Sequence, residues 1–252
     1  MLISKRYLER AAEWSSDDPV LWERYVRKYS QKFSKEDYDH LIRSSSLSVW
    51  QKKILRRVLI REAKSIVPTL TEEAFEKLNE KLKENNLTLD ITCAGGFVLQ
   101  TLGIRATADV DAFFNSSYKL DAIIRSVGDS LGINDEDESW LNNSIANMNK
   151  APKDQYRELY KSYSNLNIYT VTPEYLIGMK LKSGREKDMK DVALLLNNQG
   201  IEDPILLKKI LSSMGFRGLD FGDILACFGD AYGQRWLAEL YKIRGDELFS
   251  LL

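Results

Sequence analysis

Hydrophobic and polar positions in the first third of the chain recur with the spacing of α-helices. The clearest example is residues 46–67, SLSVWQKKILRRVLIREAKSIV, in which apolar side chains return every three or four positions. Pro68 is expected to end this helix, because proline has no N–H for the helical ladder. Thr71 is expected to cap the next helix, TEEAFEKLNEKLKENN. Residues 1–86 are therefore predicted to be a helical region.

The pattern changes at residue 87, where short segments alternate between apolar and polar positions as β-strands do. Amphipathic helices separate them, and the polar stretch 133–155 is expected to be irregular. From Pro173 onward the helical spacing returns, with Thr172 as a cap and glycine-marked turns at Gly215, Gly218, Gly229 and Gly233. The predicted class is α+β: a mixed sheet core over 87–172, flanked by the helical regions 1–86 and 173–252. The expected strands are LTLDITCA (87–94), DVDAFF (109–114) and LNIYTV (166–171).

Composition narrows the classes of function only a little. The 252 residues carry a net charge of −1, so any nucleic-acid binding must come from a local patch. Cys93 and Cys227 lie far apart in apolar stretches, which favours buried free thiols over a disulfide. There is no signal-peptide pattern and no apolar run of membrane-spanning length, so we expect a cytoplasmic protein with no membrane partner.

The stretch CAGGFVLQTLGIRATADVDAFF, residues 93–114, combines two features that suit a nucleotide. Gly95 and Gly96 lie between a predicted strand and a predicted short helix, where backbone N–H groups can approach a phosphate. Asp109 and Asp111 are two apart on a predicted strand, so their side chains share a face, about 6–7 Å apart at the backbone. Such a pair is a natural site for Mg²⁺ (or Mn²⁺).

This stretch resembles the signature of the DNA polymerase β-like nucleotidyltransferase superfamily, in which a glycine pair precedes Asp-x-Asp. The segment GIRATADVD is similar to the form found in minimal nucleotidyltransferases and in nucleotidyltransferase-like toxins of bacterial abortive-infection and toxin–antitoxin systems. The resemblance covers roughly residues 88–197 and implies a nucleotidyltransferase-type fold. It implies that Asp109 and Asp111 are catalytic and hold the metal.

A second block, TPEYLIGMKLKSGREKDMKDVALLL, agrees with the resemblance. In those families a helix carries one lysine, followed by an arginine-rich turn and Asp-x-x-Asp, and Lys180, Arg185, Asp188 and Asp191 fill these places. The resemblance implies that Lys180 contacts phosphate. Asp188 and Asp191 either supply a third acid or hold Lys180 and Arg185 in place through salt bridges.

The chain also departs from the pattern of the superfamily. Many active members carry a third carboxylate on a later strand, where this chain has Asn165 and Asn167. The second glycine, Gly96, replaces a serine that some catalytic members carry. Either Asp188 or Asp191 substitutes for the missing acid, or two carboxylates suffice.

Two further sets of residues each have a functional and a plain structural interpretation. Arg105 and Thr107 either contact the nucleotide phosphates or are an ordinary charged loop and strand entry. A basic helix face either follows an RNA backbone or is simply solvated. This face is formed by Lys53, Arg57, Arg61 and Lys64.

The function expected from these features is metal-dependent transfer of a nucleotidyl group from a nucleoside triphosphate to an acceptor. The resemblance suggests RNA, in particular tRNA, or a protein hydroxyl as the acceptor, and a toxin–antitoxin or phage-defence role with a cognate antitoxin. The alternative is a catalytically weak or inactive nucleotidyltransferase-fold module that binds RNA or protein. A P-loop kinase is excluded, because no Gly-x-x-x-x-Gly-Lys-Ser/Thr occurs.

Overall fold

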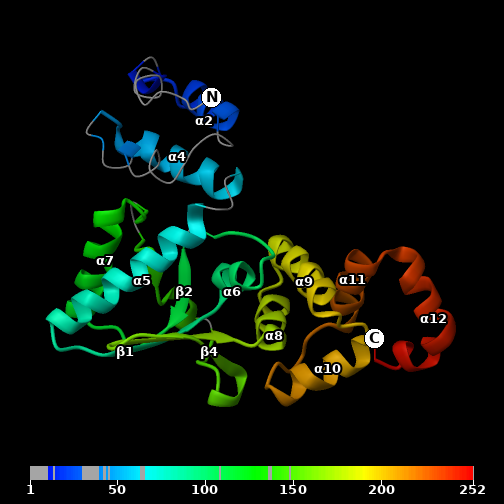
Figure 1. Cartoon of the computed structure of the whole chain (residues 1–252). Coiled ribbons are helices and arrows are strands. Elements are labelled where there is room, and N and C mark those ends of the chain that lie inside the picture. Colours follow the sequence, from blue (N-terminus) through cyan, green and yellow to red (C-terminus); the bar gives the residue numbers. More distant parts are fainter. Residues whose placement is uncertain are drawn as a thin grey trace. The chain divides into compact units, whose positions relative to one another are not determined.

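The computed structural model describes residues 11–13, 15–29, 40–41, 44, 46–62, 66–107, 109–135, 138–147 and 149–251. The chain forms two compact units, each of which is described by itself (Figure 1). The first unit takes the described residues of Met1–Ala151 together with Leu159–Tyr169. The second takes Pro152–Glu158 and the described residues of Thr170–Leu252.

A mixed β-sheet is the centre of the first unit. Within the described residues it has five strands in the order β3-β2-β1-β5-β4. Strands β1 and β2 are antiparallel, with Cys93 opposite Ala112, whereas β2 and β3 are parallel, with Asp111 opposite Asn142. The strands are β1 (Leu89–Cys93), β2 (Val110–Phe113), β3 (Leu141–Asn142), β4 (Arg157–Ser162) and β5 (Leu166–Val171).

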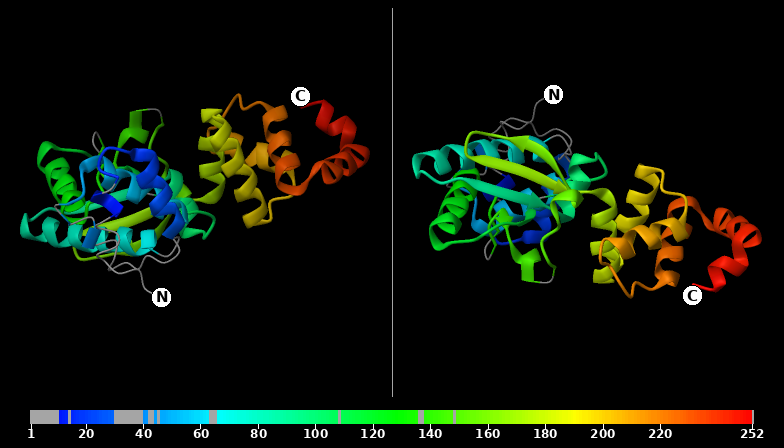
Figure 2. Two further views of the ribbon diagram at one scale, coloured as in Figure 1. Left: turned by 90° about the horizontal axis from the view of Figure 1, so that it is seen from above. Right: turned by 90° about the horizontal axis from the view of Figure 1, so that it is seen from below.

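Helices of the first unit cover one face of this sheet (Figure 2). Phe75 and Leu78 of α5, together with Ile124 of α7, are buried in one core cluster with Ile91 of β1 and Ala112 of β2. Before α5, helix α2 packs along α4. The helices of this unit are α2 (Pro19–Tyr29), α4 (Val49–Glu62), α5 (Ile66–Glu84), α6 (Gly95–Thr101), α7 (Tyr118–Leu131) and the short 3₁₀ helix η2 (Ser144–Asn147).

The second unit is helical. Thr172 caps its first long helix as predicted, because its side chain accepts a hydrogen bond from the backbone N–H of Tyr175. None of the helices among the described residues is long and apolar enough to cross a bilayer. The helices of this unit are η3 (Asp154–Tyr156), α8 (Pro173–Ser183), α9 (Glu186–Gln199), α10 (Pro204–Ser213), α11 (Phe221–Tyr232) and α12 (Gln234–Phe249).

The predicted α+β class is confirmed, and a mixed sheet with flanking helices is consistent with a nucleotidyltransferase fold. Two helix boundaries were wrong. Pro68 does not end a helix but lies in the first turn of α5, where its missing N–H removes no hydrogen bond. Thr71 is buried inside α5 instead of capping it.

The predictions for later segments also need correction. Gly229 was expected in a turn but lies within α11. A β-carbon there would stand 2.8 Å from Nε2 of Gln234, so the glycine allows a close approach of the next helix. Strand β4 was not predicted, and β3 lies in the stretch that was expected to be irregular.

Candidate functional site

The glycine turn sits between the end of β1 and the start of α6. Gly95 has a φ of +59°, in the left-handed region that favours glycine. Ala94 precedes α6 without a side-chain cap, and its backbone N–H donates to the carbonyl oxygen of Asp111 at 2.8 Å. This hydrogen bond ties the turn to strand β2 beside the predicted aspartate pair.

Gly95 lies directly against Asp111. A β-carbon built on Gly95 would stand 2.5 Å from Oδ2 of Asp111, closer than such contacts occur in proteins. The left-handed backbone favours glycine at this position, and any larger residue would also have to displace the carboxylate of Asp111.

Gly96 makes the corresponding contact with Thr107. A β-carbon on Gly96 would stand 2.5 Å from Oγ1 of Thr107, and this hydroxyl donates to Oδ1 of Asp109 at 3.1 Å. The structure thus brings the glycine pair and the aspartate pair together. Gly95 lies against Asp111, and Gly96 lies against Thr107, which is hydrogen-bonded to Asp109.

The two aspartates lie on the sheet face opposite to α5 and α7. Val110 and Ala112 are buried in the core cluster with these helices, so the alternation of β2 turns the intervening side chain of Asp111 to the other face. Asp109 directly precedes β2 and is exposed, and Asp111 is half-buried. Both carboxylates are therefore on the side of the sheet that the glycine turn borders.

The carboxylates of Asp109 and Asp111 are the two acidic groups of this site. No group of three or more His, Cys, Asp or Glu side chains placed to hold a metal ion occurs in the described part of the chain. Mg²⁺ keeps several water ligands and is usually bound by one or two carboxylates together with substrate phosphates. The donor set of Asp109 and Asp111 therefore fits a Mg²⁺ ion that arrives with a triphosphate.

Cys93 on β1 lies opposite Ala112, so its side chain faces the core together with Ala112. The thiol of Cys93 on β1 is fully buried, and burial and the nearby negative charge of Asp111 raise its pKa well above the usual range. Both Cys93 and Cys227 are buried free thiols, as predicted.

Asn142 on β3 is the residue opposite Asp111. Its Oδ1 accepts from the backbone N–H of Ser144 at 3.1 Å, and among the described residues its buried Nδ2 has no hydrogen-bond partner. Sequence reasoning did not find Asn142, because β3 is only two residues long and carries no alternating pattern.

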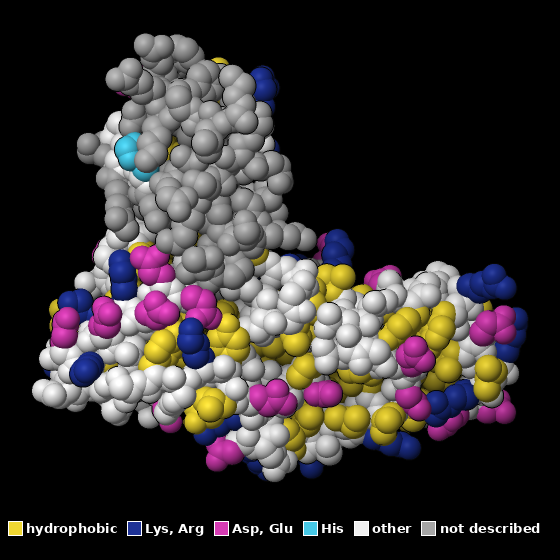
Figure 3. All heavy atoms as spheres, viewed as in Figure 1, with side chains coloured by type: hydrophobic (Ala, Val, Ile, Leu, Met, Phe, Trp, Pro, Cys, Tyr) yellow, Lys and Arg dark blue, Asp and Glu magenta, His cyan; other side chains and the backbone are white. Residues whose placement is uncertain are grey.

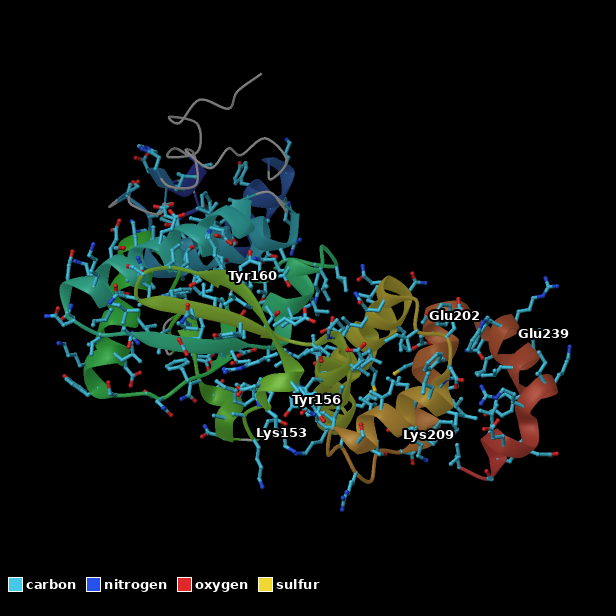
Figure 4. All side chains as sticks on the ribbon, turned by 60° about the horizontal axis from the view of Figure 1, so that its bottom comes forward. Lys153, Tyr156, Tyr160, Glu202, Lys209 and Glu239 are labelled. Carbon is cyan, nitrogen blue, oxygen red and sulfur yellow. The ribbon has the colours of Figure 1, made fainter. Side chains whose placement is uncertain are left out.

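An aromatic row anchors α6 in the core of the first unit. The ring of Phe97, next to Gly96, packs edge-on against Phe75 of α5 at 5.6 Å and against Tyr160 of β4 at 5.4 Å between centroids. Tyr160, labelled in Figure 4, donates its hydroxyl to Oε1 of Glu72 on α5 at 2.7 Å. Burial and this acceptor raise the pKa of Tyr160 to about 12. Phe97 thus packs the helix that carries the glycine turn against both α5 and β4.

The second predicted block forms a buried ion cluster in the second unit. Nζ of Lys180 on α8 donates to Oδ1 of Asp188 at 2.9 Å and to Oδ2 of Asp191 at 2.7 Å, both on α9. Lys180, Asp188 and Asp191 are 6%, 2% and 5% exposed. Arg185 adds a hydrogen bond from Nε to Asp188 at 2.6 Å, and the hydroxyl of Ser183 donates to the same carboxylate.

The charges around Asp188 decide its protonation. Burial alone raises the pKa of this carboxyl group, but hydrogen bonds from Ser183, Lys180 and Arg185 outweigh it and lower the pKa to about 2. Asp188 is therefore ionised at neutral pH, and the hydrogen bonds of this cluster join α8 to α9.

The remaining predicted residues are placed as follows. Arg105 is exposed in the loop before β2, where its Nη1 donates to the carbonyl oxygen of Ala106 at 3.5 Å. The backbones of Lys53, Arg57 and Arg61 lie in α4. Their side chains, and all of Lys64, lie outside the described residues, so the basic face stays a prediction.

Asn167 of β5 and Asn165, which directly precedes β5, both form hydrogen bonds that stabilise the sheet. Nδ2 of Asn167 donates to Oδ1 of Asp90 on β1 at 2.9 Å, and Nδ2 of Asn165 donates to the carbonyl oxygen of Leu87 at 2.9 Å. These two amides, which stand where a third acid was sought, attach β5 to β1 and to the segment before it.

Comparison with known families gives one match. Residues 70–212, more than half of the chain, match the family described as "Nucleotidyltransferase of unknown function (DUF6036)". No curated protein and no solved structure matches the chain. The matched segment runs from α5 to α10 and contains the glycine turn, the aspartate pair and the ion cluster.

Proposed function

The chain belongs to this family of nucleotidyltransferases, and from that premise we propose that it moves a nucleotidyl group from a nucleoside triphosphate to an acceptor hydroxyl, with Mg²⁺ or Mn²⁺ as the metal. The observation that carries the proposal is the contact of Gly95 with Asp111, because it sets a side-chain-free turn directly beside a carboxylate of the proposed metal-binding pair. A triphosphate and its metal ion need these two elements next to each other.

In the proposed reaction, the acceptor oxygen bonds to the α-phosphorus of the triphosphate. The bond from that phosphorus to the bridging oxygen breaks, pyrophosphate leaves with the bond's electron pair, and the hydroxyl proton passes to water. Asp109 and Asp111 would hold the metal, which when bound supplies positive charge to the triphosphate and to the acceptor oxygen. Gly95 and Gly96 let the phosphates approach the backbone, because neither carries a side chain.

Two basic residues are proposed to assist with the phosphates. Arg105 is exposed beside the aspartate pair in sequence, which supports a contact with an incoming phosphate. Lys180 is assigned to phosphate by resemblance alone. Its position between Asp188 and Asp191 supports the other expectation for these two acids, that they hold Lys180 in place.

The acceptor is proposed to be RNA, in particular tRNA, or a protein hydroxyl. This assignment, like the toxin–antitoxin or phage-defence role with a cognate antitoxin, rests on the resemblance of GIRATADVD to nucleotidyltransferase-like toxins. On the face shown in Figure 3, acidic and basic side chains of the described residues are interspersed. An RNA acceptor would therefore need a local basic surface, such as the face predicted from Lys53, Arg57, Arg61 and Lys64.

The second candidate function is a nucleotidyltransferase-fold module that binds RNA or protein without turnover. It is favoured by Asn165 and Asn167, whose amides are engaged in hydrogen bonds of the sheet where many active members carry an acid. The two candidates differ in one property: only the enzyme transfers the α-phosphate.

The experiment that separates them uses radiolabelled nucleoside triphosphates with Mg²⁺ and total cellular RNA and protein. Label on the α-phosphate should appear in an acceptor, whereas label on the γ-phosphate should remain with released pyrophosphate. The Asp109→Asn, Asp111→Asn double variant is the control for contaminating enzymes. Absence of α-label transfer with all four triphosphates would favour the binding module.

A further inference from the structure

Gln100 connects α6 to the loop that leads into the aspartate pair. Its Oε1 accepts a hydrogen bond from the backbone N–H of Thr107 at 3.1 Å. Gln100 is the last residue but one of α6, so a side chain on the glycine-turn helix fixes the position of Thr107 seven residues later.

Thr107 in turn forms a hydrogen bond to Asp109. The side chain is buried, with 8% exposure, and packs against Gly96. Its hydroxyl is directed at Asp109, with Oγ1 3.1 Å from the carboxylate Oδ1 and 3.3 Å from the carbonyl oxygen of the same residue. Three residues that are separated in sequence are therefore joined in one chain of hydrogen bonds.

We propose that Gln100 and Thr107 are positioning residues that fix the carboxylate of Asp109 for metal binding, an inference that rests on the proposed function. An exposed aspartate at the start of a strand otherwise rotates about its side-chain bonds. With Oδ1 held by Thr107, the other oxygen, Oδ2, is presented to the cation in one orientation, and the ordering occurs before the metal binds. Partners of this kind typically change metal affinity or activity by about 10–100-fold.

This role differs from a direct contact of Thr107 with phosphate. The single proton of the hydroxyl is already donated toward Asp109, and the buried side chain lies beneath the turn of Gly96. A positioning residue should change the metal concentration that the site requires. A phosphate ligand should instead change the triphosphate affinity when metal is saturating.

The test uses the full chain and two titrations. A fluorescent, non-hydrolysable analogue of the best-bound nucleoside triphosphate is first titrated with Mn²⁺ to obtain the half-saturating Mn²⁺ concentration. The analogue is then titrated at saturating Mn²⁺ to obtain its Kd. The variants are Thr107→Val, which removes the hydroxyl, Thr107→Ser, which restores it, and Gln100→Met, which removes the acceptor. The control is Thr101→Val on the same helix, whose hydroxyl donates to the carbonyl oxygen of Val98.

Thr107→Val and Gln100→Met should raise the half-saturating Mn²⁺ concentration by about 10-fold or more, as expected for partners of a metal ligand. Thr107→Ser and Thr101→Val should remain near the wild-type value, and all variants should keep a wild-type far-ultraviolet circular dichroism spectrum. An unchanged Mn²⁺ midpoint in Thr107→Val, with wild-type binding intact, overturns the inference and leaves the proposed function standing. A change confined to the Kd at saturating Mn²⁺ also overturns it, in favour of a phosphate contact. Absence of Mn²⁺-dependent binding in the wild type overturns both.

Discussion

Gly95 and Asp111 touch each other across the ends of β1 and β2, with the position of a β-carbon on the glycine 2.5 Å from Oδ2 of the aspartate. The two residues are sixteen positions apart in the sequence. Their contact brings the glycine pair and the aspartate pair together. A side chain on Gly95 would meet the carboxylate of Asp111, so a substitution there should have a larger effect than one in an ordinary turn.

Gly95→Ala is expected to damage the site beyond its effect on the turn. Alanine would carry the cost of a left-handed backbone and would also displace the carboxylate of Asp111. Gly103 is a matched control, because its φ is +71° and a β-carbon there meets nothing within 4 Å. Gly103→Ala should cost about 1–2 kcal/mol in unfolding free energy and leave triphosphate binding intact.

Gly95→Ala should cost more than Gly103→Ala by about 1–3 kcal/mol, the usual penalty for overpacking, and should weaken metal-dependent triphosphate binding. Urea unfolding followed by calorimetric titration measures both quantities. Equal losses of stability and equal triphosphate affinity in the two alanine variants would show that Gly95 is only a turn residue.

Lys180→Met is expected to destabilise the second unit, because it leaves the carboxylates of Asp188 and Asp191 buried without their shared cation. Removing one partner of a buried ion pair costs about 3–5 kcal/mol. Because Arg185 still bonds to Asp188, we expect a loss of about 3 kcal/mol in unfolding free energy. Lys182→Met is the control, since Lys182 lies on the same helix and is exposed.

Thermal and urea unfolding of the two methionine variants give the comparison. Lys182→Met should stay within about 0.5 kcal/mol of the wild type. If Lys180→Met is equally harmless to stability but abolishes triphosphate binding, the cluster serves the ligand and does not hold α8 on α9.

The low pKa of Asp188 predicts a loss of stability in acid. Burial opposes ionisation, but the bonds from Ser183, Lys180 and Arg185 lower the folded pKa to about 2, below the ordinary value of 3.8. The stabilisation is therefore fully present above about pH 4 and is lost as the pH falls toward 2. The shift corresponds to about 2 kcal/mol.

Urea unfolding of the wild type and of Asp188→Asn between pH 6 and pH 2 tests this dependence. The difference in unfolding free energy between the two proteins should shrink by about 2 kcal/mol over that range. A difference that stays constant with pH would mean that the carboxylate has an ordinary pKa in the folded protein.

Much of the fold followed from the sequence, because the relevant signals are local. The pattern of LNIYTV predicted β5, and the Thr172 cap predicted the start of α8. By contrast, β4 carries Arg157, Glu158 and Lys161 and lies at the edge of the sheet, where several of its side chains are exposed. An exposed edge strand needs no alternation of apolar and polar residues, so the sequence pattern does not predict it.

The candidate site was predictable in its residue types and not in its contacts. The spacing of the glycine and aspartate pairs indicated a nucleotide site, but nothing in the sequence specifies that Gly96 lies against Thr107 or that Gln100 accepts from the Thr107 backbone. Such contacts depend on the path of the loop between α6 and β2, which periodicity does not describe.

The basic helix face predicted from Lys53, Arg57, Arg61 and Lys64 implies a separate effect on RNA binding. Lys53→Glu, Arg57→Glu and Arg61→Glu together should weaken RNA binding and flatten its dependence on salt, because fewer counterions are released. Triphosphate binding should be nearly unchanged. Filter binding across a salt series, with Lys182→Glu, Lys187→Glu and Lys190→Glu as a control of equal charge change, measures the effect. Equal RNA affinity and equal salt slope in the two triple variants would mean that these basic residues are simply solvated.

The most direct test of the central claim is calorimetric titration of the Asp109→Asn, Asp111→Asn double variant with a nucleoside triphosphate, in the presence and absence of Mg²⁺. Asparagine keeps the shape of each side chain and removes the charge that binds the metal. The wild type should bind the triphosphate more tightly with Mg²⁺, and the double variant should lose this metal-dependent binding while keeping its fold. Unchanged metal-dependent affinity in the double variant would contradict the assignment of Asp109 and Asp111 as the metal-binding pair of a nucleotidyltransferase site.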